Sequence, residues 1–269
     1  MDLTTISEIA QARDHDASTW REGDAWLAGG TWLFSEPQPH LRRLIDLQSI
    51  GWRAISITAE HLQIAATCTI AELYSMPTPA QWTAAPLIRQ CCDSFLSSFK
   101  VWNSATVGGN ICMSLPAGPM ISLAAALEGV CIVRRRSGGE YSVPVEDFVV
   151  GNHRNILNLG DLLTRIDIPL AALGRRCAFR RVSLTHFGRS TALLIGTRNP
   201  GDGTFKLTIT AATEHPYRFN FEKIPDAQEL RSALQHGIYS FFDDVHGSPD
   251  YRAHMTYYLA EEIRRELAA

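Results

Sequence analysis

The sequence predicts an α+β protein in two parts, an α/β segment followed by an antiparallel sheet packed by helices. Early in the chain, short apolar strands end at glycines, which is typical of α/β units. In its middle the apolar residues change to helical spacing, and from about residue 173 the strands are joined by a hairpin turn signal. The chain has 269 residues, 45% of them hydrophobic. That length suits one large or two modest domains with a sizeable core.

Composition excludes several classes of protein. The 25 basic and 28 acidic residues give a net charge of −3, which argues against nucleic-acid binding. The start of the chain, MDLTTISEIAQARD, has neither the basic nor the apolar region of a secretory signal, and the longest apolar stretch, 120–127, is too short for a membrane span. The six cysteines form no C-x-x-C pair, so no zinc or iron–sulfur pattern is present. We therefore expect a reduced, cytoplasmic protein.

The first part of the chain shows strand and helix patterns in turn. AWLAGG (25–30) and RLIDL (43–47) are short apolar strands, and EHLQIAATCTIAEL (60–73) begins as a half-buried strand. Apolar residues at three- and four-residue spacing predict an amphipathic helix over 84–99, from Leu87 to Phe99. A second helix is expected in MISLAAALEG (120–129), with Gly129 as C′, the left-handed residue just past its end.

The remaining elements are mostly strands. VCIVRR (130–135), EYSVPV (140–145) and LLTRIDIP (162–169) complete the first part, and CAFRRVS (177–183), TALLIGT (191–197) and TFKLTITAAT (204–213) open the second. NPGDG (199–203) is a strong hairpin turn. Asp226 and Glu229 form a capping-box pattern before one helix, and Ser248 and Pro249 begin the last. The apolar stripe of that last helix is predicted to be Tyr251, Met255, Tyr258, Leu259, Ile263 and Leu267.

Two glycine turns are the candidate binding motifs, AGGTW (28–32) and TVGGN (106–110). Each is weak alone, but both follow secondary structure and both carry a neighbouring hydroxyl or amide. Glycine turns let successive backbone N–H groups converge on an anion. Two of them gripping one pyrophosphate would indicate a dinucleotide site without the G-x-G-x-x-G fingerprint. P-loop, H-E-x-x-H and G-x-S-x-G motifs are absent, and the nine histidines show no metal-ligand spacing.

Five segments in order resemble the FAD-binding subunit of the molybdenum hydroxylases, the xanthine dehydrogenase and carbon monoxide dehydrogenase family. They are WLAGGTWLF…RLIDLQSI, HLQIAATCTIAEL, VWNSATVGGNICMSLPAGP, EDFVVGNHRNILNLGDLLTRIDIP and DVHGSPDYRAHMTYYLAEEIRREL. The resemblance implies an FAD-binding domain over 1–172 of the broad vanillyl-alcohol-oxidase type. Its small parallel subdomain would cover about 1–55 and its larger antiparallel subdomain about 56–172. A C-terminal domain, 173–269, would follow.

The resemblance also implies the residues that hold FAD. Backbone N–H groups of one loop would line the pyrophosphate, the second loop would do so from the opposite side, and two further positions align with family residues near FAD. The first loop supplies Ala28, Gly29, Gly30, Thr31 and Trp32. The second loop supplies Thr106, Gly108, Gly109 and Asn110, and the two further positions are Leu163 and Arg180. On this view, phosphate oxygens crowd Gly108 and Gly109.

Three residues depart from the family pattern. Pro119 stands where an aspartate usually contacts the cofactor, and Trp102 stands where a basic residue precedes the asparagine at 103. Arg189 lies near a position where an acid is common. The fold is not affected by these changes, but they bear on FAD affinity and on the choice of electron acceptor.

The family role is electron transfer within a hetero-oligomer. A molybdenum-cofactor subunit oxidises the substrate, a two-cluster iron–sulfur subunit relays electrons, and the FAD subunit delivers them to NAD or another acceptor. The chain itself would carry no catalytic residue, because the cofactor supplies the chemistry. Two alternatives remain at this stage: a stand-alone flavin oxidoreductase whose second part caps a substrate site, and an assembly subunit that has lost FAD.

Overall fold

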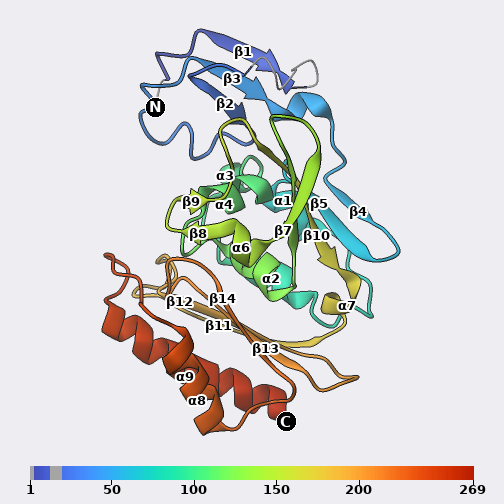
Figure 1. Cartoon of the computed structure of the whole chain (residues 1–269), viewed down its shortest axis with the longest axis vertical. Helices are drawn as coiled ribbons and strands as arrows, with labels where there is room; N and C mark the ends of the chain where they lie inside the picture. The colour runs from blue at the N-terminus through green and yellow to red at the C-terminus, as the bar shows by residue number, and fades with distance from the viewer. Residues whose placement is uncertain (1–2, 13–19) are drawn as a thin grey trace.

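The computed structural model describes residues 3–12 and 20–269, which form three main sheets stacked along the long axis of the molecule (Figure 1). The N-terminal sheet is parallel, and its strands in spatial order are β1 (Glu8–Gln11), β3 (Arg43–Asp46) and β2 (Asp24–Leu27). The middle sheet is antiparallel, in the order β4 (Ile55–Ile57), β5 (His61–Ala65), β10 (Leu162–Pro169), β6 (Val130–Arg134) and β7 (Glu140–Pro144).

The C-terminal sheet is also antiparallel, with β11 (Arg176–Val182), β12 (Ala192–Arg198), β13 (Phe205–Thr210) and β14 (Tyr217–Phe221) in chain order. A small hairpin pairs β8 (Val149–Gly151) with β9 (Arg154–Asn155). The α+β prediction and the antiparallel character of the second part are confirmed. The division into domains at about 55 and 172 stays a prediction, and the N-terminal stretch examined for a secretory signal lies partly outside the described residues.

Short helices connect and cover the sheets. They are η3 (Leu47–Ile50), α1 (Ile70–Ser75), α2 (Pro86–Asp93), α3 (Phe99–Trp102), α4 (Val107–Met113), α5 (Pro119–Ala126), α6 (Val145–Phe148), α7 (Leu170–Leu173), α8 (Ala227–Gly237) and α9 (Pro249–Ala268). Within the described ranges, no helix has both the length and the apolar character needed to cross a bilayer.

The helix predicted over 84–99 is two helices with a loop between them. α2 ends at Asp93, Leu96 has a left-handed φ of 44°, and α3 begins at Phe99. A left-handed residue cannot continue a right-handed helix. The predicted apolar stripe therefore stops short of Phe99, whose side chain is 73% exposed.

The central helix α5 is buried along its whole length. It packs between α2 and α4 on one side and strands β12 and β13 on the other, so the sequence shows no polar face. Its predicted end is wrong by one residue, because the left-handed residue is Glu128 (φ 58°) and not Gly129. The Glu128 carboxylate is held by ion pairs to Lys206 (2.6 Å) and Arg175 (2.9 Å).

The C-terminal sheet has a core on each face. Along β12, Leu193 and Ile195 join the core around α5, whereas Leu194 joins the core under α9. This alternation is the two-residue period of a strand covered on both faces. A side chain at Gly196 would collide with Ile263 of α9, which therefore lies directly on the strand. Figure 1 shows α8 and α9 together on the outer side of this sheet.

The last helix begins as predicted, with Ser248 as its N-cap and Pro249 at its first position. Its predicted stripe is correct at Leu259, Ile263 and Leu267, which are buried, but wrong at Tyr258. Tyr258 is 54% exposed, and the buried positions before Leu259 are Arg252 and Thr256.

Arg252 is the largest fully buried side chain in the described structure, at 1% exposure. Its Nε donates to Gly247 O at 2.9 Å, and Nη1 donates to the carbonyl oxygens of Thr191 (2.6 Å) and Ala211. Nη2 pairs with Asp244. One guanidinium thus ties the start of α9 to the chain before β12 and the chain after β13. Buried polar groups need such partners, because an unpaired one is costly.

Replacing Arg252 with methionine keeps most of its volume and removes all of its donors. We expect the free energy of unfolding to fall by about 3–5 kcal/mol, because three carbonyl oxygens and a carboxylate lose their partner. The matched control is Arg265→Met on the same helix, whose exposed pair with Glu261 should contribute less than about 1 kcal/mol. Urea unfolding of the three chains measures both changes. Equal midpoints for R252M and wild type would contradict this role.

Helix α4 lies very close to the end of strand β5. A Cβ added to Gly108 would stand 2.5 Å from Cβ of Ala66 and 2.7 Å from its Cα and O. The same addition at Gly109 meets only Thr106 Oγ1, at 2.9 Å. Gly108 is therefore required by packing against backbone, whereas Gly109 faces open space beyond one hydroxyl.

These neighbouring glycines give a matched pair of variants. Gly108→Ala should destabilise the fold by about 1–3 kcal/mol, because backbone cannot give way as a side chain can. Gly109→Ala should cost about 1 kcal/mol or less, since only the Thr106 cap is disturbed. Thermal or urea unfolding of both chains tests the difference. If the two variants proved equally stable, the close approach of α4 to β5 would be wrong.

Candidate functional site

The described residues form a groove of about 650 Å³, within the size range of cofactor sites. Its walls come from the loop after β2, the α2–α3 loop, helix α4, the start of α5 and the β11–β12 loop. It therefore lies where all three parts of the molecule meet.

The sequence-predicted residues divide into two groups. Eight of them line this groove: Ala28, Gly29, Gly30, Thr31, Trp32, Thr106, Gly109 and Asn110. Three lie elsewhere. Gly108 packs on Ala66 behind the groove, and Leu163 is buried in the core at 2% exposure. Arg180 of β11 pairs with Glu262 (3.1 Å) and Glu266 (2.6 Å) of α9.

The first glycine segment contacts the chain just before the second one. A Cβ on Gly29 would collide with the carbonyl oxygen of Ser104, two residues before Thr106. Backbone thus meets backbone at this seam, where only glycine leaves room. Trp26, at the end of β2, donates its indole N–H to Asp161 O at 3.1 Å and fixes the strand on the middle part.

The first loop holds a run of unused donors. The backbone N–H groups of Gly29, Gly30, Thr31 and Trp32 donate to no atom of the described residues. Gly30 has a left-handed φ of 68°, and a left-handed residue within such a run turns successive N–H groups to one side, as in an anion-binding nest. These residues are half-buried in the groove. They fit a phosphate group, because each donor otherwise lacks a partner.

The second loop is different, since its N–H groups are already used. Val107 N donates to Cys68 O and Gly108 N to Ala66 O. Gly109 N donates to Thr106 Oγ1 at 3.0 Å, and Asn110 N donates to Thr106 O. What crowds Gly108 is Ala66, not a phosphate. This segment therefore offers the groove side-chain groups, not backbone donors.

Asn110 links two helices at the groove. Its Oδ1 accepts a hydrogen bond from Met120 N at 3.0 Å and so caps the start of α5. Its Nδ2 has no partner among the described residues and remains available to a ligand. Pro119, at the first position of α5, also lines the groove. Trp102 does not: it packs edge-on against Tyr74 with ring centroids 5.1 Å apart.

The apolar walls of the groove were not predicted from the sequence. Phe95 and Leu96 come from the loop that replaces the predicted helix, and Phe187 comes from the β11–β12 loop. The one usable signal was Ser97-Ser98, because serine favours the start of a new helix at Phe99.

Arg189 is the only charged side chain among the described residues that line the groove. Its loop is fixed by Arg181, whose Nε donates to Ser190 Oγ at 2.7 Å and whose Nη2 bonds Gly188 O. Cys112 also lines the groove, and burial raises the pKa of its thiol to about 12. That thiol is protonated at neutral pH and is a poor nucleophile.

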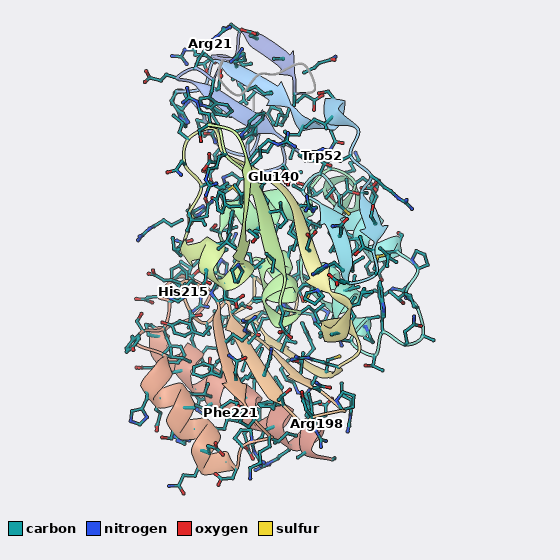
Figure 2. All side chains as sticks on the ribbon, turned by 45° about the vertical axis from the view of Figure 1, so that its right-hand side comes forward. Arg21, Trp52, Glu140, Arg198, His215 and Phe221 are labelled. Carbon is teal, nitrogen blue, oxygen red and sulfur yellow. The ribbon has the colours of Figure 1, made fainter. Side chains whose placement is uncertain are left out.

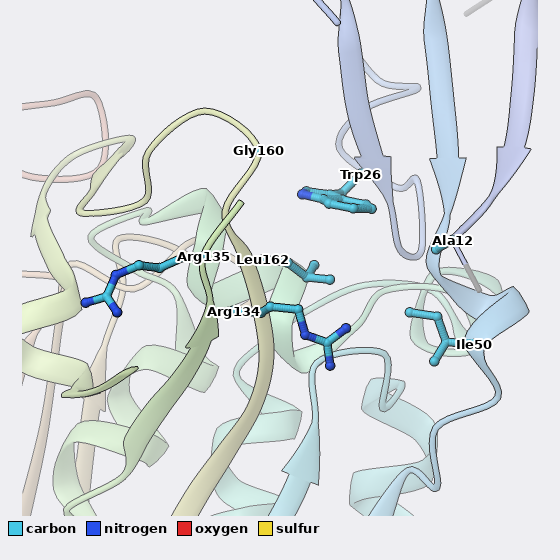
Figure 3. Close-up of a pocket in the computed structure, with 7 residues that line it drawn as sticks. All are labelled: Ala12, Trp26, Ile50, Arg134, Arg135, Gly160 and Leu162. Atoms are coloured by element: carbon cyan, nitrogen blue, oxygen red, sulfur yellow. The ribbon is translucent and has the colours of Figure 1, made fainter. Parts of the chain in front are cut away.

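A second hollow lies between the N-terminal and middle sheets, lined by Trp26, Ile50 and Leu162 among others (Figure 3). Its volume is only about 50 Å³, which suits water and not a cofactor. Its arginines are occupied, since Arg134 pairs with Glu140 and Arg135 lies over the ring of Tyr141.

Comparison with known proteins agrees with this geometry. Residues 3–171 match the family model of the FAD binding domain in molybdopterin dehydrogenase. Caffeine dehydrogenase subunit beta from Pseudomonas sp. (strain CBB1) is 28% identical over 138 residues, which span 50% of this chain and about half (46%) of that relative.

Solved structures share the fold along the whole chain. Quinoline 2-oxidoreductase from Pseudomonas putida 86 has a TM-score of 0.81 at 21% identity, covering 100% of this chain and 98% of that one. Carbon monoxide dehydrogenase from Hydrogenophaga pseudoflava has a TM-score of 0.79 at 20% identity, covering 97% and 96%. The chain therefore belongs to the FAD-binding domain family of the molybdopterin dehydrogenases, a family of oxidoreductases whose cofactor is FAD.

Proposed function

We propose that this chain is the FAD-binding electron-transfer subunit of a cytoplasmic, molybdenum-dependent dehydrogenase or oxidase complex. The observation that carries the proposal is the run of four unused N–H groups, from Gly29 to Trp32, in a groove of cofactor size. Family membership identifies FAD as the ligand that these donors suit. Bound FAD supplies two-electron redox chemistry, and the protein supplies binding, orientation and electrostatics.

Different groups in the groove would bind different parts of the cofactor. The N–H groups of the first loop would hold the pyrophosphate. Asn110 Nδ2 and the Thr31 hydroxyl would donate further hydrogen bonds, and Phe95 would cover an apolar ring. Arg189 would balance part of the negative charge of the cofactor. Gly109 leaves the groove open beyond the Thr106 hydroxyl, whereas Gly29 and Gly30 make room for Ser104 and Phe34.

The complex would pass electrons in one direction through this chain. An iron–sulfur partner would deliver them to FAD, and NAD or another acceptor would take them away, while a molybdenum-cofactor subunit oxidises the substrate. Two observations support a subunit role. The relative from Pseudomonas sp. is itself named a subunit. Among the described residues that line the groove, there is no pair of ionisable groups suited to acid–base work on a substrate.

The test is FAD uptake by the purified full chain, followed by absorption spectroscopy and anaerobic dithionite titration. We expect flavin absorption that bleaches on reduction. Gly109→Val should lower FAD affinity at least tenfold, because its side chain enters the groove. Arg189→Glu should do the same by placing an acid beside a dianionic ligand. The control Arg53→Glu changes an exposed arginine outside the groove lining and should bind FAD as wild type does.

Two outcomes would count against the proposal. A colourless chain that stays folded and takes up no added FAD would favour the assembly subunit that has lost FAD. Turnover of an organic substrate by the isolated FAD-loaded chain would favour the stand-alone oxidoreductase. Because G109V also disturbs the Thr106 cap, R189E provides an independent result if G109V unfolds.

A further inference from the structure

Besides the backbone N–H groups of its loop, Trp32 contributes its side chain to the groove. Trp32 lines the groove and is the last residue in the run whose N–H groups have no partner among the described residues. Its indole ring lies beside the imidazole of His153, with centroids 5.3 Å apart and planes inclined by 47°. The ring is half-buried, so it forms part of the wall and is not a freely moving surface side chain.

The backbone of His153 is held in place, although the residue is exposed. It sits in the turn between β8 and β9 with a left-handed φ of 54°. Its backbone N–H donates to Ser114 O at 3.0 Å, and Asn155 Nδ2 of the same hairpin donates to Cys112 O at 2.7 Å. Left-handed non-glycine residues are uncommon and persist where the surroundings hold them.

These contacts connect the Trp32 loop to helix α4 through the β8–β9 hairpin, along one side of the groove. The Trp32 loop contacts the β8–β9 hairpin through His153, and the hairpin bonds the C-terminal end of α4. The N-terminal end of α4, at Thr106 and Gly109, lines the same groove. The indole is therefore positioned before a ligand arrives, which reduces the entropy lost on binding.

An aromatic side chain next to phosphate-binding N–H groups suits a nucleotide, whose planar ring is tied to its phosphates. We propose that Trp32, backed by His153, is the wall on which one planar heteroaromatic ring of the bound dinucleotide packs. This inference rests on the proposed function. The shared chemistry is a flat π-system, which either the isoalloxazine or the adenine of FAD provides.

The experiment titrates the cofactor-free full chain with FAD, FMN and ADP, and follows tryptophan emission, flavin emission and binding heat. Trp32→Ala should weaken FAD binding by about tenfold or more. Trp32→Phe keeps a ring and should weaken it only about two- to threefold. A loss of affinity for FMN alone identifies isoalloxazine as the ring, and a loss for ADP alone identifies adenine. The control is Tyr239→Ala, which removes an aromatic side chain that is 89% exposed and lies outside the groove lining.

His153 is a positioning residue, and a double-mutant cycle tests it. His153→Ala should weaken FAD binding severalfold when Trp32 is present, and should cause no further loss in the Trp32→Ala background. Equal losses in both backgrounds would overturn the support that His153 gives to Trp32.

The titrations distinguish a missing aromatic wall at Trp32 from a chain that does not bind FAD. If W32A and W32F are folded by urea unfolding and bind all three ligands as tightly as wild type, the aromatic wall is wrong and FAD binding stands. If the wild-type chain does not bind FAD by any of these measurements, the proposed function is wrong, and so is the proposed role of Trp32. W32F keeps the test decisive if W32A does not fold.

Discussion

The contact between Gly29 and the carbonyl oxygen of Ser104 is the constraint on which the groove depends. It brings the end of a parallel strand against the segment that precedes α4, with no side chain between them. Side chains fill the space between the parts elsewhere (Figure 2), for example at Trp52, which packs against both neighbouring cores. At Gly29 the approach is closer, and the residues after it, whose N–H groups have no partner among the described residues, line the groove.

The two glycine turns look alike in the sequence but have different physical roles. In the first, the left-handed Gly30 belongs to a run of N–H groups without internal partners. In the second, the N–H groups complete bonds to Ala66, Cys68 and Thr106, and Gly108 makes room for Ala66. A glycine pair shows that something approaches the backbone closely. Whether that is a ligand or another piece of chain depends on contacts between distant residues, which local sequence does not report.

The same distinction explains how far the sequence could predict the fold. Strands such as β10 and the start of α9 at Ser248 follow from local rules of period and capping, and they were predicted. The break at Leu96 was not, because the apolar spacing continues through it although the chain turns. The buried Arg252 was also missed, since a charged residue is expected at the surface and its partners come from loops remote in sequence. For the groove, both glycine motifs contribute lining residues, while Ser97-Ser98 was the one sequence signal near the apolar walls formed by Phe95 and Phe187.

Because the groove takes walls from all three parts of the chain, it exists only when all three have folded and docked. A ligand that binds there recognises the complete native state and none of its fragments. By mass action, such a ligand adds RT ln(1 + [L]/Kd) to the free energy of unfolding, about 2.7 kcal/mol at a hundredfold excess over Kd. The supply of cofactor would then shift the folding equilibrium of the chain toward the native state. In a cell short of flavin the chain would spend more time open to proteases, and the amount of protein would follow the amount of cofactor.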